Sequence, residues 1–389
     1  MKAILPPATL GLLGGGQLGR YFVHAAHELG YRVVVLDPDP DCVAGRAADA
    51  HLVAAYDDPA ALQHLAQTCV AVTTEFESVP AAALSTLERH LPVRPGAEAV
   101  AVCQDRRMEK AFLARHGFPL APHAVILAEH DLRQADPQLF PGILKVACFG
   151  YDGKGQARVD NREEAIAAFH RFGQAACILE RRLVLDGEVS LVLARSADGA
   201  TQVFPLAENH HRDGVLDVSI VPGGSDVARF ATRAEAIAGG IATELDYVGV
   251  LGVEFFIADG EIYVNELAPR PHNSAHFTLD ACATSQFEQQ LRALCGLPLG
   301  AAEAGAATVM VNLLGDLWLA DAPAAGREPD WQKLLALPGL RLHLYGKTQA
   351  RSGRKMGHFT VCAGTREQAL ALAHAARLAI GLDATAMAA

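Results

Sequence analysis

The sequence lacks three features, and each absence excludes a class of protein. No apolar run reaches the roughly 18 residues that a membrane-spanning helix needs. Residues 1–7 lack the apolar core and cleavage pattern of a secretory signal peptide. The eight cysteines are scattered without a Cys-x-x-Cys pair, and a chain of 389 residues can form a core without disulfides. We therefore expect a cytoplasmic protein with reduced thiols and no membrane partner.

Basic charge is also scarce. Lysine and arginine number 33 against 44 aspartates and glutamates, which gives a formal net charge of −11. Binding to nucleic acid needs clustered basic charge, so the main partner is not expected to be nucleic acid. Small anionic substrates are not excluded, because they respond to the local field. At roughly 100–200 residues per domain, the length predicts two or three domains.

Strand and helix signals alternate in the first hundred residues. A short apolar strand at 9–13, a glycine turn, a helix at 21–30 and a β-branched strand at 31–36 follow one another, with a later strand at 70–74. This alternation favours a parallel α/β sheet. The remaining chain predicts helices at 106–116, 163–173, 286–295 and 366–378 and strands at 142–146, 308–313, 340–344 and 358–361.

The first glycine motif is Gly14-Gly15-Gly16-Gln17-Leu18-Gly19, which fits G-x-G-x-x-G between a strand and a helix. Asp37 follows the next strand at about the spacing of a ribose-binding acid. An NAD-dependent dehydrogenase is therefore the first hypothesis. Other phosphorylated ligands could use the same helix N-terminus, and the glycines could serve only close packing. Asp37 also fits a solvated turn.

A second glycine-rich loop, residues 149–156, follows the strand that carries Lys145. Its amides can fold over a polyphosphate, although it does not match the Walker A pattern. Lys145 would place a charge on the phosphates from a strand, and Lys154 would add one from the loop. Each lysine alone fits ordinary surface charge; together with the glycines they favour phosphate binding.

Residues 252–266 are typical of a β-hairpin, with Asp259-Gly260 as the turn signal. A two-residue loop puts Glu254 and Glu266 on opposite faces. A three-residue loop beginning at Ala258 puts them on one face, roughly 7–8 Å apart. Like charges that close need a cation, and two hard oxygen ligands suit Mg²⁺ on nucleotide phosphates. We therefore predict the three-residue loop and a metal site.

Other polar residues are candidates for ligand contacts. Glu180 could accept a hydrogen bond from an adenine amino group, and Glu188 could accept from ribose hydroxyls. Both also fit solvated or ion-paired carboxylates. Directly after the hairpin, residues 267–276 gather Arg270, His272, Asn273 and further polar side chains within a proline-stiffened loop.

At this point the motifs resemble a known superfamily. Lys145, the Gly150–Gln156 loop, Glu254 and Asn265-Glu266 resemble the ATP-grasp superfamily. Its 5-(carboxyamino)imidazole ribonucleotide synthase family is indicated by four further motifs, and the match runs from about residue 10 to about residue 378. These motifs are Gly14–Gly19, Arg270-Pro271-His272-Asn273-Ser274, Ser285–Gln289, and Tyr345-Gly346-Lys347 followed by Gly353–His358.

The resemblance implies a three-part α/β ATP-grasp fold and a homodimer. An N-terminal Rossmann-like parallel sheet would span 1–105, the ATP-grasp region 106–300 with a lid at about 120–190, and a C-terminal α+β domain 301–389. The implied reaction of purine biosynthesis carboxylates 5-aminoimidazole ribonucleotide with bicarbonate and ATP, through carboxyphosphate. A pair of Mg²⁺ ions would assist, with Mn²⁺ as a substitute.

The resemblance also implies roles for individual residues. Arg270 and His272 would face bicarbonate or carboxyphosphate, and Asp152 and Lys154 would join them as catalytic residues. Mg²⁺ would be held by Glu254 and Glu266. Contacts to ATP would come from Arg106, Lys145, Gly150, Tyr151, Asp152, Gly153, Lys154, Gly155, Gln156, Glu180, Arg181, Arg182, Leu183, Glu188, His211, Asn265 and Glu266. The ribonucleotide would be bound by Gln17, Leu18, Glu75, Tyr151, Asn273, Lys347, Arg354 and Lys355.

Three positions depart from the family pattern. Cys148 stands where a basic residue is usual, Ala275 where a glycine is common and Gln290 where a histidine is usual. The first departure predicts less positive charge near the phosphates. A formate-dependent glycinamide ribonucleotide transformylase and an inactive nucleotide-binding protein remain alternatives. The Gly-Tyr-Asp-Gly-Lys-Gly-Gln and His-Asn-Ser strings favour the imidazole enzyme.

Overall fold

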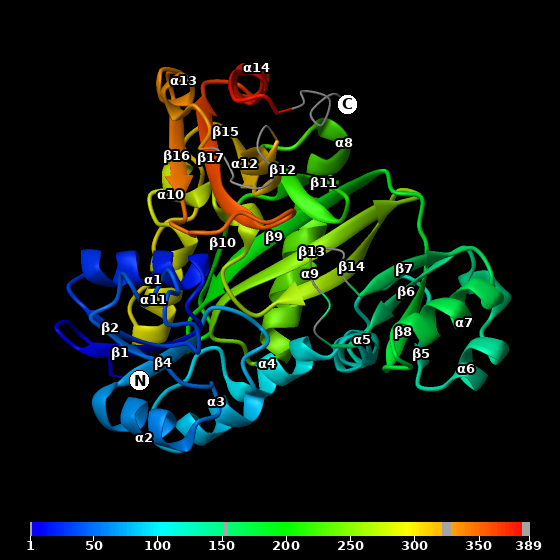
Figure 1. Ribbon diagram of the computed structural model, residues 1–389, viewed down its shortest axis with the longest axis horizontal. Helices are drawn as coiled ribbons and strands as arrows, with labels where there is room; N and C mark the ends of the chain where they lie inside the picture. Colours follow the sequence, from blue (N-terminus) through cyan, green and yellow to red (C-terminus); the bar gives the residue numbers. More distant parts are fainter. Residues whose placement is uncertain (1, 149, 151–154, 321–327, 383–389) are drawn as a thin grey trace.

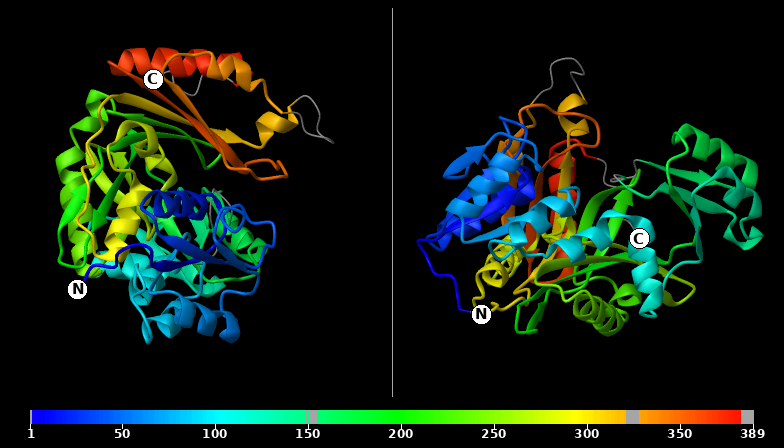
Figure 2. Two further views of the ribbon diagram at one scale, coloured as in Figure 1. Left: turned by 90° about the vertical axis from the view of Figure 1, so that its left-hand side faces the viewer. Right: turned by 90° about the horizontal axis from the view of Figure 1, so that it is seen from below.

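Three β-sheets, each built from a different part of the chain, organise the molecule (Figure 1). The computed structural model describes residues 2–148, 150, 155–320 and 328–382. Within these residues, no helix is both long and apolar enough to cross a membrane. The part of the chain that contains strands β5 to β8 stands to one side of the other two sheets in Figure 1 and in the right-hand view of Figure 2.

The first sheet is parallel, in the strand order β3-β2-β1-β4, which confirms the predicted parallel α/β arrangement. Leu10, Leu12 and Val33 belong to the core on one side of it, and Leu13 and Val34 to the core on the other. Both faces are therefore covered, which explains the continuous apolar runs of its strands. Its elements are β1 (Thr9–Leu13), α1 (Gln17–Glu28), β2 (Arg32–Leu36), β3 (Ala50–Leu52), α2 (Pro59–Thr68), β4 (Ala71–Thr74), α3 (Ala81–Glu88) and α4 (Ala97–Gln104).

The small sheet is antiparallel, in the order β5-β8-β6-β7, and lies within the range predicted for the lid. Leu144, Leu179 and Phe169 are fully buried in its core, where α7 packs against the strands. Its elements are β5 (His123–Ile126), α6 (Glu129–Gln134), the 3₁₀ turn η1 (Pro137–Leu139), β6 (Gly142–Val146), β7 (Gln156–Val159), α7 (Arg162–Arg171) and β8 (Cys177–Arg181).

The large sheet has nine strands in the order β14-β13-β9-β11-β12-β15-β17-β16, with β10 paired to β9. Its strands are β9 (Gly187–Arg195), β10 (Thr201–Val203), β11 (Ala207–Arg212), β12 (Val215–Val221), β13 (Gly249–Ala258), β14 (Glu261–Ala268), β15 (Ala307–Leu314), β16 (Leu340–Leu344) and β17 (Lys355–Ala363). Pairing of β12 with β15 joins the predicted ATP-grasp and C-terminal regions into one sheet.

Helices cover this sheet and connect it to the other two. The long helices α9 (Ala231–Glu244) and α14 (Arg366–Ala379) pack on opposite halves of the sheet. α5 (Arg106–Arg115) and α11 (Gln286–Cys295) link it to its neighbours. The short elements are α8 (Ser225–Ala228), η2 (Asn273–Ala275), α10 (Thr278–Ala281), α12 (Asp316–Leu319) and α13 (Trp331–Leu335).

Gln290 of α11 connects the first sheet to the large sheet. Its amide nitrogen donates to Thr73 Oγ1 at 2.9 Å and to the carbonyl oxygen of Arg94 at 3.1 Å. Its amide oxygen accepts from the backbone N–H of Val250 at 2.6 Å. Glutamine supplies the donor and the acceptor at once, which is a physical reason for this residue at a position where the family pattern has histidine.

Candidate active site

The β13–β14 hairpin carries the two acidic residues predicted to bind metal, and its loop differs from the prediction. Ala258 pairs with Glu261, so the loop has the two residues Asp259 and Gly260, both with positive φ (52° and 73°). The predicted three-residue loop is therefore wrong. The register shifts by one residue between Glu254 and Phe255.

This β-bulge changes which residues face each other. The extra residue is Asn265, and Glu254 pairs directly with Glu266. Residues directly opposite on antiparallel strands share a face of the sheet, so the two carboxylates lie on one face. The arrangement that the metal hypothesis required is present, although a bulge produces it and not the loop.

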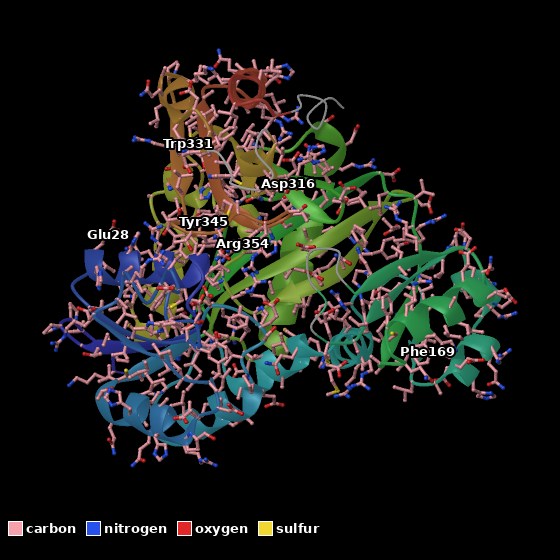
Figure 3. All side chains as sticks on the ribbon, viewed as in Figure 1. Glu28, Phe169, Asp316, Trp331, Tyr345 and Arg354 are labelled. Atoms are coloured by element: carbon pink, nitrogen blue, oxygen red, sulfur yellow. The ribbon has the colours of Figure 1, made fainter. Side chains whose placement is uncertain are left out.

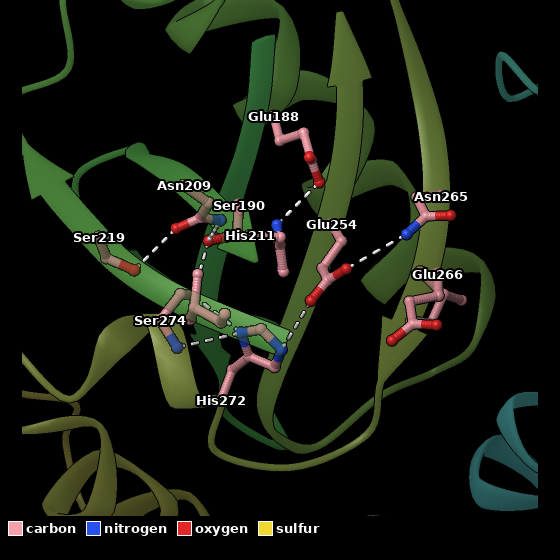
Figure 4. Close-up of polar contacts among 12 residues, drawn as sticks. Glu188, Ser190, Asn209, His211, Ser219, Glu254, Asn265, Glu266, His272 and Ser274 are labelled. Atoms are coloured by element: carbon pink, nitrogen blue, oxygen red, sulfur yellow. Dashed lines mark hydrogen bonds and ion pairs between the residues drawn. The ribbon is translucent and has the colours of Figure 1, made fainter. Parts of the chain in front are cut away.

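Glu254 is held by two partners (Figure 4). Its Oε1 lies 3.1 Å from His272 Nε2, and its Oε2 accepts a hydrogen bond from Asn265 Nδ2 at 3.2 Å. Burial alone would raise the pKa of Glu254, but its hydrogen bonds with His272 and Asn265 hold it well below its usual range. The carboxylate is thus ionised, which is the form that binds a hard divalent cation.

Arg106, at the start of α5, connects Glu266 with the second glycine loop. Its Nη1 donates to Glu266 Oε2 at 3.0 Å, and its Nη2 donates to the carbonyl oxygen of Gly150 at 3.3 Å. A guanidinium in this position can pair with phosphate oxygens that enter between the loop and the hairpin. The donor set of Glu254, Glu266 and the Asn265 amide oxygen consists of hard oxygens and fits Mg²⁺.

Lys145 of β6 and Lys110 of α5 enclose Glu180 of β8. Lys145 Nζ lies 2.6 Å from Glu180 Oε2, and Lys110 Nζ lies 3.1 Å from Glu180 Oε1. Burial alone would raise the pKa of Glu180, but the two lysines hold it far below its usual range. Both carboxylate oxygens therefore face an ammonium group, not an open adenine site. Lys145 also donates to Asn265 Oδ1 at 3.4 Å, which places its ammonium group next to the β13–β14 hairpin.

Glu188 and His211 lie together on β9 and β11. Glu188 Oε2 is 2.8 Å from His211 Nδ1. Burial lowers the pKa of His211, but Glu188 and the charge of Glu254 outweigh it and raise the pKa overall. Two residues predicted to contact ATP are thus neighbours at the face that carries Glu254.

The loop after β14 contributes Arg270 and reveals a residue that the sequence did not. Arg270 Nε donates to Glu77 Oε2 at 2.5 Å. Burial would raise the pKa of Glu77, but Arg270 lowers it to about 2. Glu77 belongs to no motif and follows β4, so only the tertiary contact identifies it. Asn273 is buried, and neither of its amide atoms has a hydrogen-bond partner among the described residues.

Three of the predicted ribonucleotide residues, Gln17, Lys347 and Lys355, meet where the C-terminal strands approach the first sheet, near Tyr345 and Arg354 in Figure 3. Lys347 Nζ donates to Gln17 Oε1 and to the carbonyl oxygen of Lys355, both at 2.7 Å. Arg354 Nη1 donates to the carbonyl oxygen of Gln349 at 2.6 Å. Residues separated by more than three hundred positions are therefore in contact.

The first glycine motif is occupied by the chain's own carboxylates. Glu75 accepts from the backbone N–H groups of Gly16 and, at 2.6 Å, Gly19. Asp37 is buried and accepts from the Gly15 N–H at 2.7 Å and the Tyr56 hydroxyl at 2.6 Å. Asp37 is thus a brace, neither an open ribose acceptor nor a solvated turn, which removes support for the dehydrogenase hypothesis.

Several predicted residues remain to be placed. Tyr151, Asp152, Gly153 and Lys154 lie outside the described residues. Leu18 is buried against Phe287, so its side chain belongs to the core. The other predicted ATP contacts flank the small sheet: Gly155 and Gln156 at the start of β7, and Arg181, Arg182 and Leu183 at the end of β8.

The two remaining departures from the family pattern fit their surroundings. Ala275 is buried in a core cluster with Phe277 and Val192, and its φ is negative. Burial raises the pKa of the Cys148 thiol, with the charge of nearby Asp105 acting in the same direction. The charge of Arg107 also acts on this thiol. A cation therefore lies near position 148, where the family pattern has a basic residue.

One further group among the described residues has metal-ligand chemistry: Asp280, His343 and His358. The rings of His343 and His358 stack 4.5 Å apart with planes only 13° from parallel. Their in-plane lone pairs therefore run side by side and do not converge on one point. Asp280 Oδ2 already lies 2.8 Å from His343 Nε2, and the Tyr345 hydroxyl bonds His358 Nδ1 at 2.9 Å. The cluster is better explained by packing.

Known proteins match this chain along nearly its whole length. Residues 7–104 match the ribonucleotide synthetase preATP-grasp domain, residues 111–287 the ATP-grasp domain, and residues 308–372 the phosphoribosylaminoimidazole carboxylase C-terminal domain. The N5-carboxyaminoimidazole ribonucleotide synthase of Brucella melitensis is 44% identical over 362 residues, which are 92% of this chain and 97% of that relative. The chain belongs to the N5-carboxyaminoimidazole ribonucleotide synthase family.

Solved structures of the family agree with this assignment. An ADP complex of an N5-carboxyaminoimidazole ribonucleotide synthetase has a TM-score of 0.88 at 41% identity and covers 97% of this chain and 98% of its own. The Aspergillus clavatus enzyme with ADP and 5-aminoimidazole ribonucleotide has a TM-score of 0.87 at 29% identity, covering 96% and 98%. The chain is thus an ATP-grasp ligase of the N5-carboxyaminoimidazole ribonucleotide synthase family, as the motifs indicated.

Proposed function

We propose that the site described above carries out the reaction of this family. The chain catalyses the ATP-dependent carboxylation of 5-aminoimidazole ribonucleotide to N5-carboxyaminoimidazole ribonucleotide in purine biosynthesis. Bicarbonate attacks the γ-phosphate of ATP and releases ADP, and the resulting carboxyphosphate gives CO₂ and phosphate. The exocyclic amine of the ribonucleotide captures the CO₂. The protein contributes positioning and charge neutralisation.

The observation that carries this proposal is the face shared by Glu254 and Glu266 beside Arg106 and Lys145. Arg106 and Lys145 bind the ATP phosphates, exchanging their present partners Glu266 and Glu180 for phosphate oxygens. A pair of Mg²⁺ ions, or Mn²⁺, held by Glu254 and Glu266 would neutralise phosphate charge. Asp152 and Lys154 are part of the same proposal, in the glycine loop.

The other reactants fall to residues around this face. Arg270 and His272 hold bicarbonate or carboxyphosphate, since their donors lie beside Glu77 and Glu254 at the end of the hairpin. The buried, unpaired amide of Asn273 needs a partner, and the ribonucleotide supplies one. The remaining ribonucleotide contacts are those implied by the motifs: Gln17, Glu75, Tyr151, Lys347, Arg354, Lys355 and the backbone of Leu18, whose side chain lies in the core.

Three further features belong to the proposal. The domain boundaries are 1–105, 106–300 and 301–389, with the lid at about 120–190 closing over ATP. The active form is a homodimer. All eight cysteines are free, which fits the reducing conditions of the cytoplasm, where we propose that the protein acts.

The test is ADP release from ATP, Mg²⁺ and bicarbonate, with and without 5-aminoimidazole ribonucleotide. We expect release to depend on the ribonucleotide. ADP release that does not depend on this ribonucleotide but is stimulated by formate and glycinamide ribonucleotide would refute the proposed substrate. Glu266→Gln should abolish turnover in a folded protein, whereas Glu261→Gln, an exposed residue on the same strand, should not.

A further inference from the structure

Four buried side chains form a hydrogen-bonded line that ends at His272 (Figure 4). Ser219 Oγ donates to Asn209 Oδ1 at 2.8 Å, and Asn209 Nδ2 donates to Ser190 Oγ at 2.8 Å. Ser190 Oγ donates to Ser274 Oγ at 2.6 Å, and Ser274 Oγ lies 2.8 Å from His272 Nδ1. All four residues are buried, with at most 4% of their surface exposed. We call these four residues the relay.

The relay has a defined direction, because each group has a fixed number of protons. The Asn209 amide nitrogen can only donate, so the Ser190 oxygen accepts from it. Ser190 must then direct its single proton to Ser274. The Ser274 proton is left for His272 Nδ1. The direction of the whole line therefore depends on which end of the Asn209 amide faces Ser190.

Two independent contacts at His272 agree with this direction. The backbone N–H of Ser274 also points at His272 Nδ1, at 3.4 Å, and an N–H group cannot accept. On the other side of the ring, Nε2 lies 3.1 Å from the carboxylate oxygen Oε1 of Glu254. A proton on Nε2 turns that contact into a hydrogen bond, whereas a lone pair there would repel the carboxylate.

We propose that the relay is a positioning device that selects one tautomer of the His272 imidazole, with the proton on Nε2 and the lone pair on Nδ1. His272 then presents a hydrogen-bond donor to the active site and not a basic nitrogen. In this form it can hold an oxygen of bicarbonate or carboxyphosphate, but its Nε2 cannot remove a proton from the ribonucleotide amine. The inference rests on the proposed function only for which reactant His272 faces. Ser190, Asn209, Ser219 and Ser274 act through His272 and touch no reactant.

The direct test is the ¹⁵N spectrum of the histidine rings, recorded without substrates at alkaline pH. The signals of His272 are assigned by their loss in His272→Gln. We expect Nδ1 to show the shift of an unprotonated nitrogen and Nε2 that of a protonated one. The opposite assignment in the wild-type protein would overturn the inference.

Asn209→Asp tests whether the relay causes this tautomer. The replacement has nearly the same shape, but an ionised carboxylate only accepts. Ser190 then turns its proton to residue 209, Ser274 donates to Ser190, and His272 has to donate from Nδ1. We expect the two ring signals to exchange and kcat to fall by roughly 10–100-fold, with the KM for ATP unchanged. A folded Asn209→Asp protein that keeps the wild-type tautomer would overturn the inference.

Asn312→Asp is the matched control. Asn312 is as deeply buried, and its amide donates to the carbonyl oxygen of Leu216 at 2.9 Å, outside the relay. It should leave the His272 signals unchanged, and exchanged signals in this variant would show that any buried carboxylate has the effect. If Asn209→Asp does not fold, Ser274→Ala replaces it. In Ser274→Ala we expect the ¹⁵N signal of His272 Nδ1 to move toward the chemical shift of a protonated nitrogen. An unmoved signal would refute the relay.

The two proposals can fail separately. Wild-type protein that shows the expected tautomer but releases no ADP with the ribonucleotide would refute the function and leave the tautomer standing. Variants that exchange the tautomer but keep wild-type kcat would refute the positioning role of the relay.

Discussion

Glutamine at position 180 would remove the negative charge from between two buried lysines. Glu180 Oε2 lies 2.6 Å from Lys145 Nζ and Oε1 lies 3.1 Å from Lys110 Nζ. The side chains of the three residues are 5%, 8% and 2% exposed. In Glu180→Gln, two ammonium groups share this space without the carboxylate that now separates them. We therefore expect the nucleotide-free protein to be destabilised.

The size of the effect follows from burial. Removing one partner of a buried ion pair lowers stability by about 3–5 kcal/mol. The glutamine oxygen still accepts from one lysine, which retains about 1 kcal/mol. The remaining loss of about 2–4 kcal/mol corresponds to a fall in Tm of roughly 4–16 °C for a domain of this size.

Nucleotide should reverse much of this loss. In the wild type, ATP has to draw Lys145 away from Glu180, whereas in Glu180→Gln the triphosphate replaces a missing negative charge. We expect Mg²⁺ with a non-hydrolysable ATP analogue to raise the Tm of Glu180→Gln by more than that of the wild type. Differential scanning calorimetry measures both shifts, and Glu163→Gln, exposed on α7, is the control. A wild-type Tm for nucleotide-free Glu180→Gln would refute this reasoning.

Three other predictions concern separate parts of the molecule. Gln290→Leu leaves the buried N–H of Val250 unpaired, so the free energy of unfolding measured by calorimetry should fall by about 1–3 kcal/mol for each buried polar group that loses its partner. An unchanged Tm would contradict the bridging role of Gln290. Lys347→Ala should raise the KM for the ribonucleotide several-fold, since a lost charged hydrogen bond is worth ~1.5–3 kcal/mol, and leave the KM for ATP unchanged. An unaltered ribonucleotide KM would remove Lys347 from the proposed ribonucleotide contacts. His210, the Gly224 N–H and Arg366 lower the pKa of Glu208 to about 2. The ionised form is therefore stabilised, and the contribution, about 1–2 kcal/mol after solvent screening, is present above pH ~4.3 and lost as pH falls toward 2. The Tm of the wild type should be higher than that of Glu208→Gln at neutral pH, and this difference in Tm should disappear in acid. A difference that widens in acid would contradict the assignment.

The sequence indicated the candidate residues of the site more readily than their geometry. Glu254, Glu266 and Lys145 could be proposed because they flank a hairpin turn and a glycine-rich loop. The loop length was wrong because Asp259-Gly260 forms a two-residue turn and a bulge at Asn265 supplies the extra residue. Nothing in the local sequence marks that bulge, which lies within the strands of the hairpin and not at its turn.

Tertiary contacts explain the rest of what the sequence did not reveal. Glu77 is recognisable only through Arg270, which lies 193 positions away. Asp37 matched the spacing of a ribose-binding acid, yet the structure uses it to brace the glycine turn and Tyr56. Spacing along the chain is compatible with both roles, and the hydrogen-bond partners distinguish them. The parallel arrangement of the first sheet, by contrast, followed from the alternation of strands and helices along the chain.

The ladder between β12 and β15 has a consequence for cutting the chain. Every residue of β12 is buried, and β15 covers one of its two long edges. A truncation after residue 300 would expose that edge as a row of unpaired N–H and C=O groups on an apolar seven-residue strand. Such an edge is a template for pairing with another molecule. By covering this edge, the C-terminal region also protects the protein from aggregation. The shortened protein should therefore precipitate before its nucleotide site can be studied in isolation.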